Sequence, residues 1–234
     1  MVERSRIFSI AGLILSSLAA IFVIASFASP YWVETETRVS GSGFERMGLW
    51  VACFHNYYPV NRPITNKRYE GCWQGISYEM NDLYDHFFPV WLRAVQALMT
   101  LAVLMTLACV KLNIIYFIRC CSHNRNRIFV LISAIFSFVA AFFLILSTII
   151  FGVKVDQDRE WLPQPDSVSL AWAYGFAILA GFLTLFSGMC MATDFVRMRL
   201  EDKYDSAAHG SGPAVRYAAP PPNYNHAVNG KHRY

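Results

Sequence analysis

The sequence predicts an all-α transmembrane four-helix bundle with a small extracellular antiparallel β-sheet. Three observations lead to this fold class: four long stretches almost without charge, an uneven distribution of basic residues between the loops, and two cysteines in one loop. Hydrophobic residues make up 55% of the 234 residues and charged residues only 15%, whereas globular chains have about 25% charged residues. This composition excludes an ordinary water-soluble domain and favours an integral membrane protein.

Four apolar stretches are long enough to cross a membrane. They lie at about 7–28, 88–110, 128–153 and 168–193. At about 1.5 Å of helical rise per residue, each covers a hydrocarbon core of roughly 30 Å. None shows the polar face of a soluble helix, and the single charged residue in them is Arg93, near the start of the second stretch.

The first stretch could also be a signal peptide, because Arg4 and Arg6 precede it. It is longer, however, than the roughly 7–15 apolar residues of a signal core. Gly12, Ser16 and Ala20 recur at every fourth position, a spacing that lets helices pack closely in a membrane. We therefore expect an uncleaved first span.

The loops between the spans differ in charge. The 111–127 loop has Lys111, Arg119, Arg125 and Arg127 and no acidic residue, whereas acidic residues outnumber basic ones in the 154–167 loop. Because basic loops stay in the cytoplasm, we expect both termini there and the 29–87 and 154–167 loops outside. The net charge of +4 follows from this bias and does not indicate a nucleic-acid partner.

The domain organisation follows from this topology. A four-pass membrane domain covers residues 1–195, and a disordered cytoplasmic tail is expected over 196–234. From Ser206 the tail is rich in Gly, Ala, Pro, Asn and His, which predicts disorder.

Cys53 and Cys72 are the two cysteines on the expected outer side. Disulfides persist in that oxidising compartment, so we predict that these two residues pair. A zinc site would need more Cys or His ligands at short spacing than His55 supplies.

The long outer loop has the pattern of a small sheet. Alternating polar and apolar residues predict strands at 31–39, 47–54 and 69–78, with a turn at 40–43 and an exposed loop at 57–67.

A set of residues in and next to this loop, in a fixed order, indicates a protein family. Trp32 follows the first span, Gly48-Leu49-Trp50 comes next, then Cys53 and Cys72, and Arg93 stands at the start of the second span. This order resembles the W–GLW–C–C signature of the claudin superfamily over about residues 1–195. The resemblance implies that the tryptophans and the disulfide brace an extracellular sheet, and that members assemble side by side and across the gap between cells.

Two alternatives stay open for these residues. The tryptophans either brace the loop or anchor it at the lipid boundary. Arg93 either snorkels to the headgroups and braces the loop or takes part in ion passage.

The segment between Cys53 and Cys72 is long for a vertebrate claudin. The flanking Met47–Phe54 and Gly71-Cys72-Trp73 are more similar to claudin-like proteins of insect septate junctions. We expect a structural protein of lateral cell–cell junctions in the plasma membrane that polymerises in cis and in trans and forms or regulates a paracellular barrier. An auxiliary subunit of another membrane protein is the alternative, and a channel or transporter acting alone is a third.

The sequence has no nucleotide-binding loop, nucleophile elbow or pair of catalytic carboxylates. We therefore predict neither enzymatic activity nor a cofactor.

Three cytoplasmic features predict modification or scaffold binding. Cys120 and Cys121 lie just past the second span, where S-palmitoylation is common; the alternative is a pair of unmodified thiols. Pro221-Pro222-Asn223-Tyr224 fits the P-P-x-Y pattern that WW domains bind, although so short a pattern also arises by chance. The terminal Tyr234 could enter a PDZ domain through its carboxylate, although claudins usually end in Val.

Overall fold

The structure is a computed structural model of the chain. It describes residues 2–35, 43–58, 68–80, 84, 86–118, 123–157 and 168–210. The chain divides into two compact units, Met1–Arg197 and Met198–Tyr234, and all packing reported below lies within the first.

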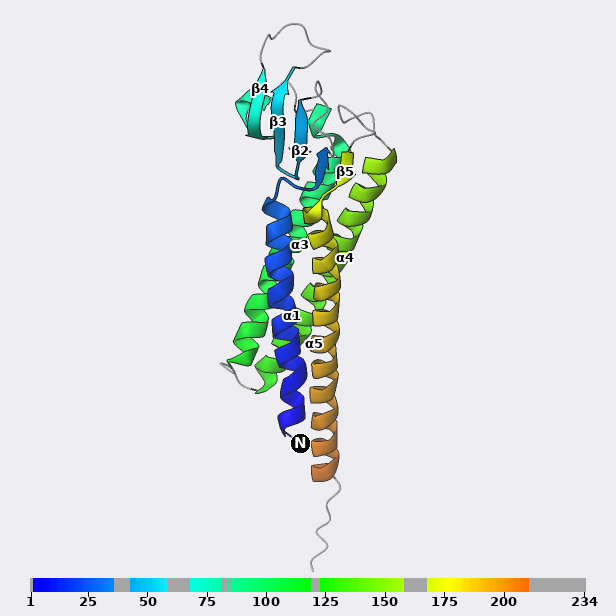
Figure 1. Ribbon diagram of the computed structural model, residues 1–234. Coiled ribbons are helices and arrows are strands. Elements are labelled where there is room, and N and C mark those ends of the chain that lie inside the picture. Colours follow the sequence, from blue (N-terminus) through cyan, green and yellow to red (C-terminus); the bar gives the residue numbers. More distant parts are fainter. Residues whose placement is uncertain are drawn as a thin grey trace, which may run out of the picture. The chain divides into compact units, whose positions relative to one another are not determined.

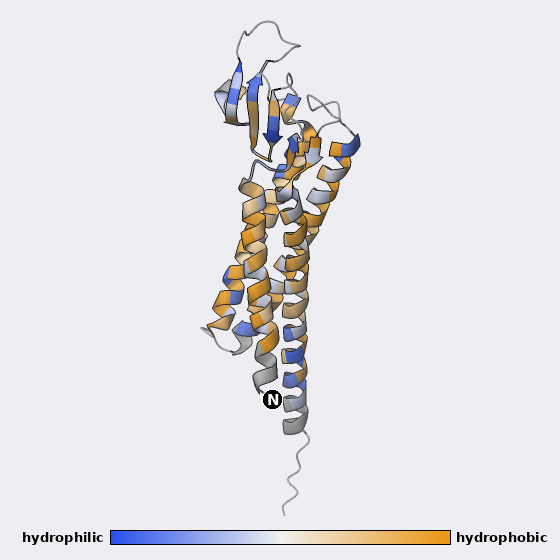
Figure 2. Cartoon of the chain, in the orientation of Figure 1, coloured by the Kyte–Doolittle hydropathy of each residue, from blue (hydrophilic) through white to orange (hydrophobic). Residues whose placement is uncertain are grey.

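Four long helices dominate the first unit (Figure 1). They are α1 (Val2–Ala28), α3 (Val90–Phe117), α4 (His123–Gln157) and α5 (Trp172–Gly210). Each is long and apolar enough to cross a membrane, and their outward surfaces carry many exposed aliphatic side chains, as contact with lipid requires. Figure 2, coloured by hydropathy, shows mainly hydrophobic residues along the helices and more hydrophilic residues in the sheet.

The helices differ from the predicted spans at their ends. Pro89 is the N-cap of α3, as expected for a residue without an N–H donor. The predicted start of the fourth span at 168 is wrong, because α5 begins at Trp172. The predicted disorder from 196 is wrong for residues 196–210, which are helical. This segment contains good helix formers such as Glu201 and Lys203, so a helix that leaves the membrane can continue.

Each helix packs against at least two others. Helix α1 contacts α3 and α5, where the Ser187 hydroxyl donates to the Gly12 carbonyl at 2.9 Å. Helix α4 contacts α3 and α5, where the Tyr174 hydroxyl donates to the Thr148 carbonyl at 3.1 Å. A Cβ atom at Gly12 would lie 2.7 Å from Met191 Sδ. The small residues therefore permit close packing, as predicted.

A five-stranded antiparallel sheet covers one end of the bundle, called the sheet end below (Figure 1). Its order is β4-β3-β2-β1-β5. The strands are β1 (Val33–Thr35), β2 (Phe44–Met47), β3 (Val51–Tyr57), β4 (Tyr69–Gln74) and β5 (Val168–Leu170). The predicted fold class, a membrane four-helix bundle with a small antiparallel sheet, is confirmed.

Two strand predictions were wrong. Residues 47–54 do not form one strand, because the chain turns at 48–50 and divides them between β2 and β3. The predicted strand at 69–78 ends at Gln74. The fifth strand was not predicted: β5 lies between α4 and α5 in the chain and pairs with β1, Val33 lying opposite Leu170.

Aromatic side chains fill the space between the sheet and the helices. Phe54 and Phe87 pack edge to face with ring centroids 5.0 Å apart, and Phe44 stacks on Phe87 at 6.0 Å. All three are buried. Nearby, burial raises the pKa of the Tyr57 phenol above its ordinary value, so this ring stays neutral and packs as an apolar group.

Candidate functional site

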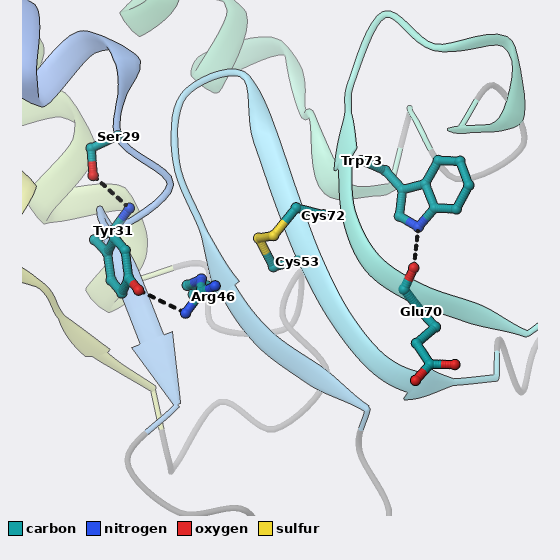
Figure 3. The surroundings of a disulfide bond; sticks show 7 residues. All are labelled: Ser29, Tyr31, Arg46, Cys53, Glu70, Cys72 and Trp73. Carbon is teal, nitrogen blue, oxygen red and sulfur yellow. Dashed lines mark hydrogen bonds between the residues drawn. A yellow bond between two sulfur atoms is a disulfide. The ribbon is translucent and has the colours of Figure 1, made fainter.

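The disulfide joins the two strands farthest from β5. Cys53 in β3 lies opposite Cys72 in β4, and their sulfur atoms are bonded at 2.02 Å (Figure 3). The predicted pairing is therefore confirmed. Because the bond links neighbouring strands, it closes the β3–β4 hairpin and limits how far the two strands can separate.

Trp32 connects the sheet to three helices. Its ring is completely buried and meets Phe151 of α4 at 4.7 Å and Tyr174 of α5 at 5.9 Å between centroids. Its indole N–H donates to the carbonyl of Ser26 in α1 at 2.8 Å. This geometry is that of a core residue that braces the sheet, not of an aromatic anchor exposed to lipid.

Gly48 allows the turn between β2 and β3 to lie directly on the end of α1. A Cβ atom at Gly48 would be only 2.1 Å from the Ser29 carbonyl oxygen and 2.8 Å from Pro30 Cα. No larger residue fits without displacing this backbone. The requirement for glycine therefore comes from close approach between two chain segments.

Leu49 and Trp50 complete the turn. Leu49 is fully buried, and its carbonyl accepts a hydrogen bond from Gln96 Nε2 at 2.5 Å. The Trp50 ring packs edge to face on Phe27 of α1, with centroids 5.3 Å apart. The turn is thus held by α1 on one side and by α3 on the other.

Arg93 lies in the first turns of α3. Its Nε donates to the Phe88 carbonyl at 3.2 Å, and its guanidinium carbon lies 5.1 Å from the centre of the Tyr84 ring. Both contacts are with the segment that leads from the sheet into α3. The observed geometry therefore suits bracing of that segment.

Residues 17–192 match the family described as PMP-22/EMP/MP20/Claudin tight junction. This range includes the sheet, α3, α4, parts of α1 and α5, and every signature residue described above. The chain belongs to this claudin superfamily. It is accordingly a junction-type membrane protein. A search of curated proteins finds no individual match.

Sequence reasoning missed two polar residues of this claudin-type site. One is Gln96, which is buried in α3. The sequence clue was an amide side chain within an otherwise apolar span. The other is Arg46 of β2, whose Nη1 donates to the Tyr31 hydroxyl at 2.7 Å. The Arg46 guanidinium also lies 4.6 Å from the centre of the Tyr31 ring, which in turn packs on Trp172 of α5 at 5.5 Å.

The sheet also presents polar groups away from the helices. His55, Glu70 and Gln74 are exposed. In the described part of the chain, no group of His, Cys, Asp and Glu side chains is arranged to hold a metal ion. This surface is therefore suited to contacts with another molecule through hydrogen bonds and charge.

Several predicted sites lie outside the described residues. They are the two candidate palmitoylation sites, the WW motif and the terminal carboxylate: Cys120, Cys121, Pro221, Pro222, Tyr224 and Tyr234. They stay predictions.

Proposed function

We propose that this claudin-superfamily protein polymerises in the plasma membrane and that its sheet forms or regulates a paracellular barrier at septate junctions. The observation that supports this most directly is the attachment of the sheet to the bundle. Trp32 contacts α4 and α5, the turn at 48–50 contacts α1 and α3, and β5, which directly precedes α5, pairs with β1 of the same sheet. A sheet attached at so many points can resist the forces between two adhering cells.

The proposed orientation puts the sheet outside the cell and both termini in the cytoplasm. Basic residues lie near the end of the bundle opposite the sheet, Lys111 toward the end of α3 and Arg127 near the start of α4, as the positive-inside rule predicts for a cytoplasmic end. The Cys53–Cys72 disulfide lies in the sheet, where an oxidising environment would preserve it.

Contact across the intercellular gap would use the far end of the β3–β4 hairpin. Strand β3 ends at Tyr57 and β4 begins at Tyr69, at the end opposite the turn that contacts the bundle. The described strand ends that flank the long segment between the two cysteines thus lie at the end of the hairpin away from the turn at 48–50. Contacts in cis would form between neighbouring copies in one membrane.

The cytoplasmic tail would connect the polymer to scaffold proteins. Pro221, Pro222 and Tyr224 would bind a WW domain, and the Tyr234 carboxylate a PDZ domain. Deleting residues 211–234 should then release the protein from the scaffold without changing the sheet.

The decisive experiment is knock-down in an epithelial sheet followed by a tracer-dye permeability assay. We expect increased dye passage, restored by the wild-type chain but not by the Trp32→Ala variant, which loses the brace. Immunolocalisation with the same chains should show staining concentrated at lateral junctions. Unchanged dye exclusion together with uniform basolateral staining would contradict the proposal and favour an auxiliary subunit.

A further inference from the structure

The turn that follows β4 exposes two large apolar side chains. Ile76 is 82% exposed and Tyr78 is 93% exposed. The turn is nevertheless ordered, because the Ser77 N–H donates to the Gln74 carbonyl and the Met80 N–H to the Ser77 carbonyl, each at 3.0 Å. Two neighbouring exposed apolar side chains on an ordered turn indicate a surface that lipid or another molecule covers.

The turn lies at the level where α1 ends. The N–H of Gly75 donates to the Trp50 carbonyl at 2.8 Å. The ring of Trp50 packs on Phe27, and α1 ends one residue later, at Ala28. The base of the turn is thus tied to the sheet end of the first span.

The position of the turn beside the start of α3 leads independently to the same depth in the membrane. A Cβ atom at Gly75 would lie 2.7 Å from Cζ of Phe88, and α3 begins two residues later at Val90. Val90 is itself 78% exposed and begins the apolar surface of a span. The exposed turn therefore adjoins the lipid-facing surface of α3, at the depth of the headgroups, where aromatic side chains gather.

The turn also borders a cleft of about 410 Å³, lined by Gly75, Ile76, Ser77, Tyr78 and Tyr84. The Oγ atom of Ser77 is buried and has no hydrogen-bond partner among the described residues. A buried hydroxyl is disfavoured without a partner, and a lipid ester or phosphate oxygen would accept a hydrogen bond from it. The guanidinium of Arg93 over the Tyr84 ring adds positive charge beside the cleft.

We propose that residues 75–80 form a lipid-binding foot of the sheet. Ile76 and Tyr78 enter the headgroup region of the leaflet at the sheet end, and the cleft takes the glycerol-ester part of one phospholipid. This contact would fix the tilt of the sheet relative to the membrane. The proposed lipid contact requires that the four helices span a membrane, but it does not require the proposed junction function.

Photo-crosslinking tests the proposal directly. The photoreactive amino acid benzoylphenylalanine would replace Tyr78 in the full-length protein reconstituted into phosphatidylcholine vesicles, and mass spectrometry would identify the adducts after illumination. The matched control places it at Tyr58, an exposed tyrosine (44%) just past the far end of β3. We expect a phospholipid adduct several-fold more abundant at Tyr78 than at Tyr58.

A second label at Ile76 covers the case in which the Tyr78 variant does not fold. Circular dichroism and the intact Cys53–Cys72 disulfide identify the folded variants. Lipid adducts from either folded variant support the foot. Adducts to a second copy of the chain, equal lipid adducts at Tyr58, or no adduct from either position would overturn the proposal.

Discussion

The sheet end and the opposite half of the bundle are held together by different interactions. At the sheet end, the buried Trp32 ring packs between Phe151 and Tyr174. In the opposite half, the Asn113 amide donates to the Ser16 hydroxyl at 3.0 Å and accepts a hydrogen bond from the hydroxyl of Ser133. Aromatic contact dominates in one region and polar contact in the other.

The surrounding solvent explains the difference. The sheet covers its aromatic core from water, so the hydrophobic effect stabilises that region. Between helices in lipid, apolar contact brings little gain, and small residues and hydrogen bonds hold the helices together. Asp194 extends the polar pattern: it is buried and accepts hydrogen bonds from Ser9 at 2.7 Å and Tyr116 at 2.9 Å. Substitutions in the two regions should therefore differ in size.

The largest effect is expected for Trp32→Ala. Removing a fully buried tryptophan leaves a cavity and should lower the free energy of unfolding by about 3–5 kcal/mol. Denaturant titration in detergent micelles, followed by circular dichroism, measures this loss. The half-exposed Trp172 is the matched control, and an equal loss for Trp172→Ala would show that Trp32 is not the brace.

Removal of the disulfide should have the next largest effect. The double substitution Cys53→Ser and Cys72→Ser opens a loop with a sequence separation of 19 and should destabilise the sheet by about 3 kcal/mol. Trypsin should then cut faster at Lys67 and Arg68, while the helical circular-dichroism signal persists. A loss of helix in the same variant would mean that the two regions do not differ as described.

Gly48→Ala tests the close approach at the base of the sheet. The new methyl group would meet the Ser29 carbonyl oxygen, and overpacking of this kind costs about 1–3 kcal/mol. Gly175 is the control, because no atom lies within 4 Å of a Cβ placed there. Gly175→Ala should be neutral or stabilise α5 by up to about 1 kcal/mol, so equal destabilisation by both substitutions would disprove the steric explanation.

The smallest effect is expected for Asn113→Ala in the lipid-embedded half. Hydrogen bonds between helices in membranes contribute about 0.6 kcal/mol on average and at most about 1.7. Ser17→Ala is the control, since the Ser17 hydroxyl donates within its own helix to the Leu13 carbonyl. A loss for Asn113→Ala as large as that for Trp32→Ala would remove the contrast between the regions.

The same contrast explains which predictions succeeded. The spans were evident because each depends on a continuous run of apolar residues, which lipid requires. Strand β5 was missed because Val168–Leu170 has no charged residue and runs directly into a span, so composition alone could not separate strand from helix. The turn within 47–54 was missed because strand residues flank it on both sides.

By itself, the sequence determined the four spans, the cysteine pair and the superfamily resemblance. These follow from local composition and from the order of a few residues. Only the tertiary structure showed why Gly48 must be glycine, why Gln96 lies in an apolar helix, and which strand β5 pairs with. Each of these depends on a distance between segments far apart in the chain, such as Gly48 to Ser29 or Leu49 to Gln96, and such distances exist only after the helices and the sheet have packed together.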